Sequence, residues 1–258
     1  MDIVFGLLTA LGWGTTDVVV RLVGLRLGVL RSMFFGQCVG LIVLTFWLVL
    51  HPQSVEGSAS GWIAAVLAAL LNLGATAALF RGLSVGRIAL ISPVTASYGA
   101  VTALLAAASG EAFTVSTAAG VGVTVAGVMI ASSRSDRGAS DTSVRPGLPW
   151  ALLAAACFGV GSWLMGTFAV PGLGPVLPVW IYYLLGAATL MIAAFASGNR
   201  LEPPRAGSLL LVLALGALGS VSFIAFSARI EHWRCGGRHG AQLVIQCGHR
   251  ASRPRAVA

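Results

Sequence analysis

The stretch VLRSMFFGQCVGLIVLTFWLVL (29–50) decides the fold class of this chain. Arg31 is its one charged residue, and the apolar run that follows continues to Leu50. About 20 mostly apolar residues in a helix cross the hydrocarbon core of a bilayer. Because hydrocarbon satisfies no backbone hydrogen bonds, a stretch of this kind must form a helix if it lies in lipid. Residues 29–50 therefore predict a transmembrane helix.

Seven further apolar runs repeat this pattern along the 258 residues. With the first example, the eight predicted helices cover 3–20, 29–50, 61–80, 88–108, 114–131, 148–170, 175–197 and 208–228. The chain is 57% apolar and only 9% charged, whereas a soluble domain carries about 25% charged residues. The first run has no basic segment or small-residue cleavage pattern before it, so we expect a retained helix. The predicted fold is an all-α, polytopic membrane helical bundle.

The net charge is +8, and all 16 basic residues behind it are arginines, since the chain contains no lysine. Most of these arginines lie between the apolar runs, where such charges set membrane topology. We therefore expect the lipid bilayer as the partner, and no nucleic acid. The four cysteines show no disulfide framework, and Cys38 and Cys157 lie inside apolar runs.

The polar stretch SSRSDRGASDTSVRPG (132–147) divides the chain into two parts. Residues 1–131 form a predicted five-helix repeat, and 148–231 form a partial second repeat of three helices. LLTALGWG (7–14) resembles LLAAACFG (152–159), and Phe80-Arg81 is matched by Phe226 followed by Arg229. Since five is odd, tandem five-helix repeats insert with opposite orientations, as in many secondary transporters. We predict two inverted repeats, the second incomplete.

Several segments resemble the drug/metabolite transporter superfamily in its EamA-type, ten-helix branch. ALGWGTTDVVVRL (10–22) is similar to the family's first helix, and VLR (29–31) to the start of its second. FRGLSVGRIALISPVTASYGAVTALLAAASGEAFTVSTAAGVGVTVAGVMIA (80–131) resembles the end of helix three, helix four, a Gly-Glu hinge and a Gly-rich helix five. The resemblance covers about residues 3–231 and implies ten helices and a transport function.

The segment 232–258, HWRCGGRHGAQLVIQCGHRASRPRAVA, departs from that pattern. Cys235, His239, Cys247 and His249 suggest a zinc site, although their spacing matches no standard finger. A basic tail on anionic lipid is a second reading, but the apolar residues form no helical stripe. We favour a third reading, a shifted reading frame. Starting one base later with free synonymous codons permits an apolar helix that resembles ALISPVTASYGAVTAL (89–104). On this reading, the tail is non-native and helices nine and ten are missing.

Ionisable residues at membrane depth are functional candidates because they are costly there. Asp17 lies deep in the first run, where a desolvated carboxylate can exchange a proton for a substrate. Alternatively, Asp17 forms a structural ion pair with Arg21, which lies one helical turn later. Arg21 and Arg31 match basic positions of the family and could meet an anionic substrate, or reach out to the interface as loop charges. Glu111 begins the turn between the predicted helices four and five and is expected to be a structural hinge or cap.

Pro93 interrupts the run 88–108 and frees a backbone carbonyl, as in the broken helices that line transporter cavities. Five aromatic residues could line a path for an organic substrate or form interfacial belts: Trp13, Tyr98, Trp163, Tyr182 and Tyr183. Asn72 is expected to bond across helices.

These observations predict a multi-pass transporter of the plasma (inner) membrane. We expect it to export a small organic metabolite or drug by alternating access, driven by a proton or by exchange. No nucleotide-binding motif or catalytic constellation is visible, so we expect neither an enzyme nor a cofactor. An inactive truncated membrane protein, or a membrane partner that does not transport, is the alternative, and a homodimer is left open. The arginine count places the N-terminus outside the cytoplasm, whereas the family resemblance implies the reverse.

Overall fold

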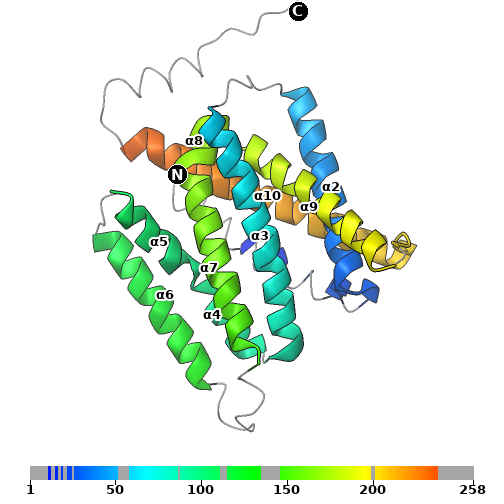
Figure 1. Cartoon of the computed structure of the whole chain (residues 1–258), viewed down its shortest axis with the longest axis horizontal. Coiled ribbons are helices and arrows are strands. Elements are labelled where there is room, and N and C mark those ends of the chain that lie inside the picture. Colours follow the sequence, from blue (N-terminus) through cyan, green and yellow to red (C-terminus); the bar gives the residue numbers. More distant parts are fainter. Residues whose placement is uncertain are drawn as a thin grey trace, which may run out of the picture.

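The computed structural model describes residues 11, 12, 15, 16, 19, 22–24, 26–51, 58–86, 88–110, 115–134, 146–198 and 201–237. Every described element is a helix (Figure 1). In chain order they are α2 (Val29–Leu50), α3 (Ala59–Val85), α4 (Ile88–Ala96), α5 (Tyr98–Ala108), α6 (Val115–Arg134), α7 (Leu148–Leu164), the π-helix η2 (Met165–Ala169), α8 (Val170–Leu173), α9 (Leu177–Ala196) and α10 (Ala206–Gly237). The prediction of an all-α bundle is confirmed.

Six segments of the described residues are long and apolar enough to cross a membrane. They are Leu30–Leu50, Ala59–Gly82, Ile91–Ala108, Leu148–Leu173, Leu177–Ala196 and Gly207–Ala225, which correspond to six of the eight predicted runs. The run 114–131 forms α6, but its apolar part, Ala118–Gly127, is shorter. The run 3–20 lies mainly outside the described residues.

Two predicted runs contain backbone irregularities. The run 88–108 is divided at Ser97, four residues after Pro93. Pro93 itself lies inside α4, and a proline disturbs the turn before it, not the turn after it. In the run 148–170, the helix widens into a π-turn at Met165–Ala169, a feature that often occurs at functional sites. The apolar pattern alone did not predict the π-turn.

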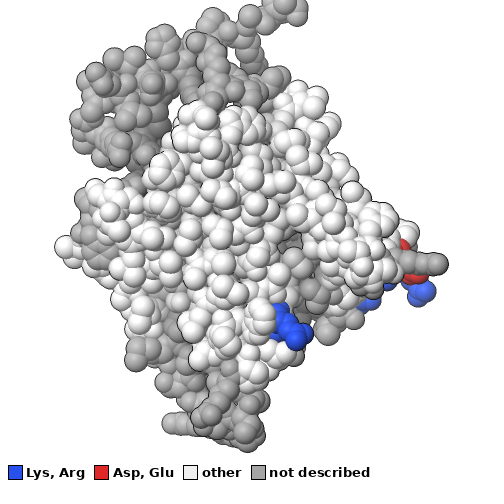
Figure 2. Space-filling model, viewed as in Figure 1, with Lys and Arg blue, Asp and Glu red and all other residues white. Residues whose placement is uncertain are grey.

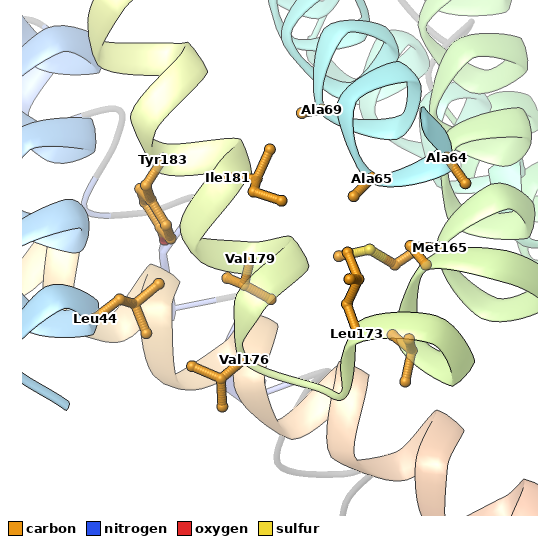
Figure 3. Close-up of a cluster of buried hydrophobic side chains, with 12 residues drawn as sticks. Leu44, Ala64, Ala65, Ala69, Met165, Leu173, Val176, Val179, Ile181 and Tyr183 are labelled. Carbon is orange, nitrogen blue, oxygen red and sulfur yellow. The ribbon is translucent and has the colours of Figure 1, made fainter. Parts of the chain in front are cut away.

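Small residues allow the central helices to approach closely. The core side of α3 carries the buried alanines Ala64, Ala65 and Ala69. Figure 3 shows Ala65 and Ala69 facing α9 and Ala64 facing the helix that carries Met165. Ile181 of α9 points toward α3, while Tyr183 points away on the other side. Helix α3 packs on α7 and α9, and α2 packs on α9 and α10. Helices α4 and α5 pack on α7, with α6 outside them. Such packing needs small side chains because lipid gives helices no hydrophobic reason to associate.

The outer surface is apolar, as a lipid-facing surface must be. Ile42, Phe46 and Val49 on one face of α2 are 67%, 67% and 71% exposed. In water, so large an exposed apolar face would be costly. Figure 2 shows a broad uncharged band, with basic side chains toward the lower and right margins of the described surface. The chain therefore presents the surface of a multi-pass membrane protein.

Candidate functional site

Helices α2 and α9 cross at two glycines that lie midway along the spans. A Cβ on Gly186 of α9 would lie 2.6 Å from the amide carbon of Gln37 on α2. A Cβ on Gly40 of α2 would overlap the ring of Tyr183 on α9. Gln37 and Tyr183 each stand three residues before the glycine of their own helix. Each helix therefore places a large polar side chain over the glycine of the other.

A network of hydroxyl and amide groups surrounds this crossing. The Tyr182 hydroxyl lies within hydrogen-bonding reach of the Gln37 amide and of Thr76 on α3. The Thr76 Oγ1 donates its one proton to Asn72 O at 2.8 Å. The Tyr183 hydroxyl lies within reach of Ser220 on α10.

The proton of Ser220 is also assigned, because its Oγ donates to Gly216 O at 2.7 Å. Aromatic rings enclose the network on one side. The ring centroid of Phe223 on α10 lies 5.0 Å from Tyr182, and the rings of Tyr182 and Tyr183 are 5.2 Å apart. We call Gln37, Thr76, Tyr182, Tyr183, Ser220 and Phe223 the central cluster. It joins α2 and α3 of the first half to α9 and α10 of the second.

One atom of the central cluster stays unpaired. Gln37 is only 7% exposed, and its carbonyl oxygen Oε1 has no hydrogen-bond partner. Leaving a buried acceptor unsatisfied costs about 1–3 kcal/mol. The hydroxyl protons of Thr76 and Ser220 are already donated to backbone carbonyls, so neither can pair with this oxygen without breaking that bond. The arrangement can therefore accept a hydrogen bond from a molecule that enters the cluster.

The sequence-predicted candidates lie in several places. Arg31 lies at the start of α2, where its Nη2 contacts Glu202 at the backbone O (2.7 Å) and at Oε2 (3.2 Å). Pro93 lies within α4, and Tyr98 packs on Phe158 of α7 with ring centroids 5.9 Å apart.

Trp163 of α7 donates from Nε1 to the Ser109 hydroxyl at 2.9 Å, tying α7 to the end of α5. Pro93, Tyr98 and Trp163 thus belong to the packing of α4 and α5 on α7. Trp13, Asp17, Arg21 and Glu111 lie outside the described residues.

Gln37 and Thr76 were missed by the sequence reading, whereas Tyr182 and Tyr183 were included as aromatic candidates. A signal for Gln37 was present: it is an amide inside an apolar run, flanked by Gly36 and Gly40. The prediction for Asn72 was wrong in one respect. Its Nδ2 donates to Ala68 O of the same helix at 2.8 Å, because Gly161 of α7 packs against the amide and supplies no side chain.

Among the described residues, no three His, Cys, Asp or Glu side chains are grouped so that they could hold a metal ion. The tail residues of the zinc reading lie outside the described side chains. Helix α10 continues to Gly237, so the backbone stays helical into the predicted tail segment.

The central cluster is polar, contains no charged residue and lies among several apolar spans. This arrangement defines a multi-pass membrane protein with an internal polar site. The model of the EamA-like transporter family matches residues 1–133, half of the chain. The chain belongs to the EamA-like transporter family, and its class is that of membrane transporters of small molecules. A comparison with curated proteins gives no match.

Proposed function

We propose that the protein exports a small organic molecule across the plasma membrane by alternating access of its two halves, and that the molecule engages the central cluster. The observation that carries this proposal is the unpaired Oε1 of Gln37 at the crossing of α2 and α9. Buried polar atoms without partners are rare, and each calls for an explanation. Polar residues at membrane depth commonly mark substrate pathways.

The chemistry of the central cluster favours a particular class of substrate. An amide oxygen and several hydroxyls lie beside three aromatic rings, and no described member of the cluster is charged. A molecule with an N–H or O–H donor and a flat apolar part would pair with Gln37 and lie against the rings. Such a molecule is a neutral metabolite or drug of moderate polarity.

A matching register of the two halves supports alternating access between inverted repeats. Aligning Phe80 with Phe226 places Gly40 opposite Gly186 and Gln37 opposite Tyr183 without a gap. The same register places Gly28 opposite Gly174, and both have a φ of 79°. The crossing of α2 and α9 is then a contact between equivalent positions. Sites in inverted-repeat transporters lie at such an interface near the bilayer midplane.

The distribution of arginine supports an orientation. Arg26 and Arg31 precede or begin α2, Arg81 lies near the end of α3, and Arg205 precedes α10. Since successive spans alternate in direction, these positions lie on one membrane face. The positive-inside rule assigns that face to the cytoplasm. A proton or an exchanged solute would drive the transport, and Asp17 is the coupling candidate that we propose.

The test compares cells that express the chain with cells that express Gln37→Met and with cells lacking both. Untargeted mass spectrometry of medium and cytosol should show metabolites that are exported only by the unmodified chain. A version with the reading frame restored after residue 231 is measured in parallel. If only that version exports, the chain that carries the tail 232–258 is an inactive form. If neither version changes any metabolite, the protein is a membrane partner and not a transporter.

A further inference from the structure

Equivalent positions of the two halves make different contacts at the two ends of the molecule. The register that aligns Phe80 with Phe226 also pairs Arg26 with Gly172, and Gly61 with Gly207. The structure joins Gly172 to Gly61 at one end and Arg26 to Gly207 at the other. In each contact, a residue that precedes the second helix of one half meets a glycine at the start of the third helix of the other half. Gly172 and Arg26 are the first members of these contacts, and Gly61 and Gly207 are the second. The two contacts can therefore be compared directly.

The contact at the first end is a direct approach of two backbones. A Cβ on Gly61 would lie 3.2 Å from the Cα of Gly172, and a Cβ on Gly172 would lie 3.0 Å from the Cα of Gly61. The Oγ of Ser58 caps α3 by accepting from Gly61 N at 3.1 Å and lies beside Gly172. We call Ser58, Gly61 and Gly172 the glycine seam. It has no charged member, and a Cβ at either glycine would be in tighter contact than is usual.

The contact at the other end is made by long charged side chains. Arg26 Nη1 donates to Gly207 O at 3.2 Å. Arg31 Nη2 donates to Glu202 O at 2.7 Å and forms an ion pair with Glu202 Oε2 at 3.2 Å. The Arg31 and Glu202 side chains are 28% and 70% exposed. We call Arg26, Arg31, Glu202 and Gly207 the arginine latch.

We propose that the arginine latch is a releasable gate, and that the molecule opens more readily at this end than at the glycine seam. The inference rests on the proposed alternating access. Exposed ion pairs contribute little stability and are weakened by salt, since water solvates the separated charges. Closely packed backbones gain no such compensation from water, and their dispersion contacts are lost at once when they part. A flexible arginine arm also tolerates movement that a glycine contact does not.

The test measures how easily the centre is reached from each end. In a chain with its four cysteines replaced by serine, Ser220→Cys provides a reporter at a site that is 0% exposed. A membrane-impermeant maleimide is applied to vesicles of either orientation. Single cysteines at the exposed positions Ala59 and Arg205 establish which end faces the reagent. No substrate is needed, so the result does not depend on identifying one.

Arg26→Gln and Glu202→Gln should each raise labelling of the reporter from the latch end by about threefold, as expected for loss of a weak exposed contact. Labelling from the seam end should stay unchanged. Arg205→Gln, which removes an exposed arginine of the same face from outside the latch, is the matched control. In the protein with an intact latch, high salt should raise the labelling of the reporter from the latch end. This measurement needs no latch variant, so it gives a result even if a variant misfolds.

Exchanging the pair, Arg31→Glu with Glu202→Arg, restores the ion pair but not the hydrogen bond from residue 31 to the backbone O of residue 202, so labelling should return part of the way to the original rate. Equal labelling from both ends, or labelling unaffected by salt and by both variants, would overturn the latch. Failure of the proposed function is a separate result. In that case no metabolite is exported, while the latch-end labelling still responds to the variants.

Discussion

Replacing Gln37 with methionine is expected to make the protein more stable and less active at the same time. Methionine keeps the unbranched shape of the side chain but removes the amide. The buried Oε1 without a partner costs about 1–3 kcal/mol, and its removal recovers that cost. The polar contact of the amide with the Tyr182 hydroxyl is lost, at a cost of about 0.5–1.5 kcal/mol. Tyr182 keeps Thr76 beside it. The net change is a stabilisation of about 1 kcal/mol.

The assay has two parts. Thermal unfolding of the purified protein in detergent, followed by tryptophan fluorescence, gives the change in stability. Export of the metabolites identified for the unmodified chain gives the change in activity, and it should fall at least about tenfold if one hydrogen bond to substrate is lost. Thr124→Val is the control, because its hydroxyl bonds only Gly120 O of its own helix on α6. Thr124→Val should change neither the stability nor the export appreciably.

The opposite result would refute the reasoning. If Gln37→Met lowers stability and leaves export intact, the amide serves packing and the unpaired oxygen has no role with a substrate. If export falls together with stability, the loss reflects damage to the fold. Only a stable variant with impaired export supports the site.

Three other results are expected. Gly186→Ala should lower the free energy of unfolding by about 1–3 kcal/mol, because the added Cβ overpacks against Gln37. Gly74→Ala is the control, since nothing lies within 4 Å of its added Cβ, and it should leave stability unchanged. Thermal unfolding compares the two variants. Asp17→Asn should abolish the dependence of export on a proton gradient, and flux that responds to the gradient as before would remove Asp17 from coupling. Trp163→Phe should cost about 0.5–1.5 kcal/mol through the lost bond to Ser109, with export unchanged in the same metabolite assay.

Much of the fold could be predicted because lipid leaves the backbone few choices. Apolar stretches of spanning length must satisfy their hydrogen bonds internally, so 29–50, 61–80 and 175–197 could only become helices. Pro93 did not locate the break in the run 88–108, because a proline disturbs the turn before it and the break lies four residues after it, at Ser97. The π-turn at Met165–Ala169 left no mark in the sequence either. Its geometry depends on how the end of α7 packs on α3, which is not local information.

The site was harder to predict because it depends on partners distant in the chain. A buried amide is visible at Gln37 in the sequence, but whether its oxygen is paired depends on Tyr182 and Thr76, which lie on other helices. The assignment follows only when the protons of those hydroxyls are counted. Glycine positions were likewise visible in the sequence, yet only the crossing of α2 and α9 shows which side chain covers which glycine.

The sequence by itself determined the solvent, the helices and the family resemblance, because hydropathy and length are properties of each segment alone. The tertiary structure decided where polar groups meet, since that depends on the rotation and contact of helices from both halves. It also distinguished the two ends of the molecule. Arg26 and Gly172 occupy equivalent places in the chain, and only their neighbours in space show that one end is held by charge and the other by backbone contact.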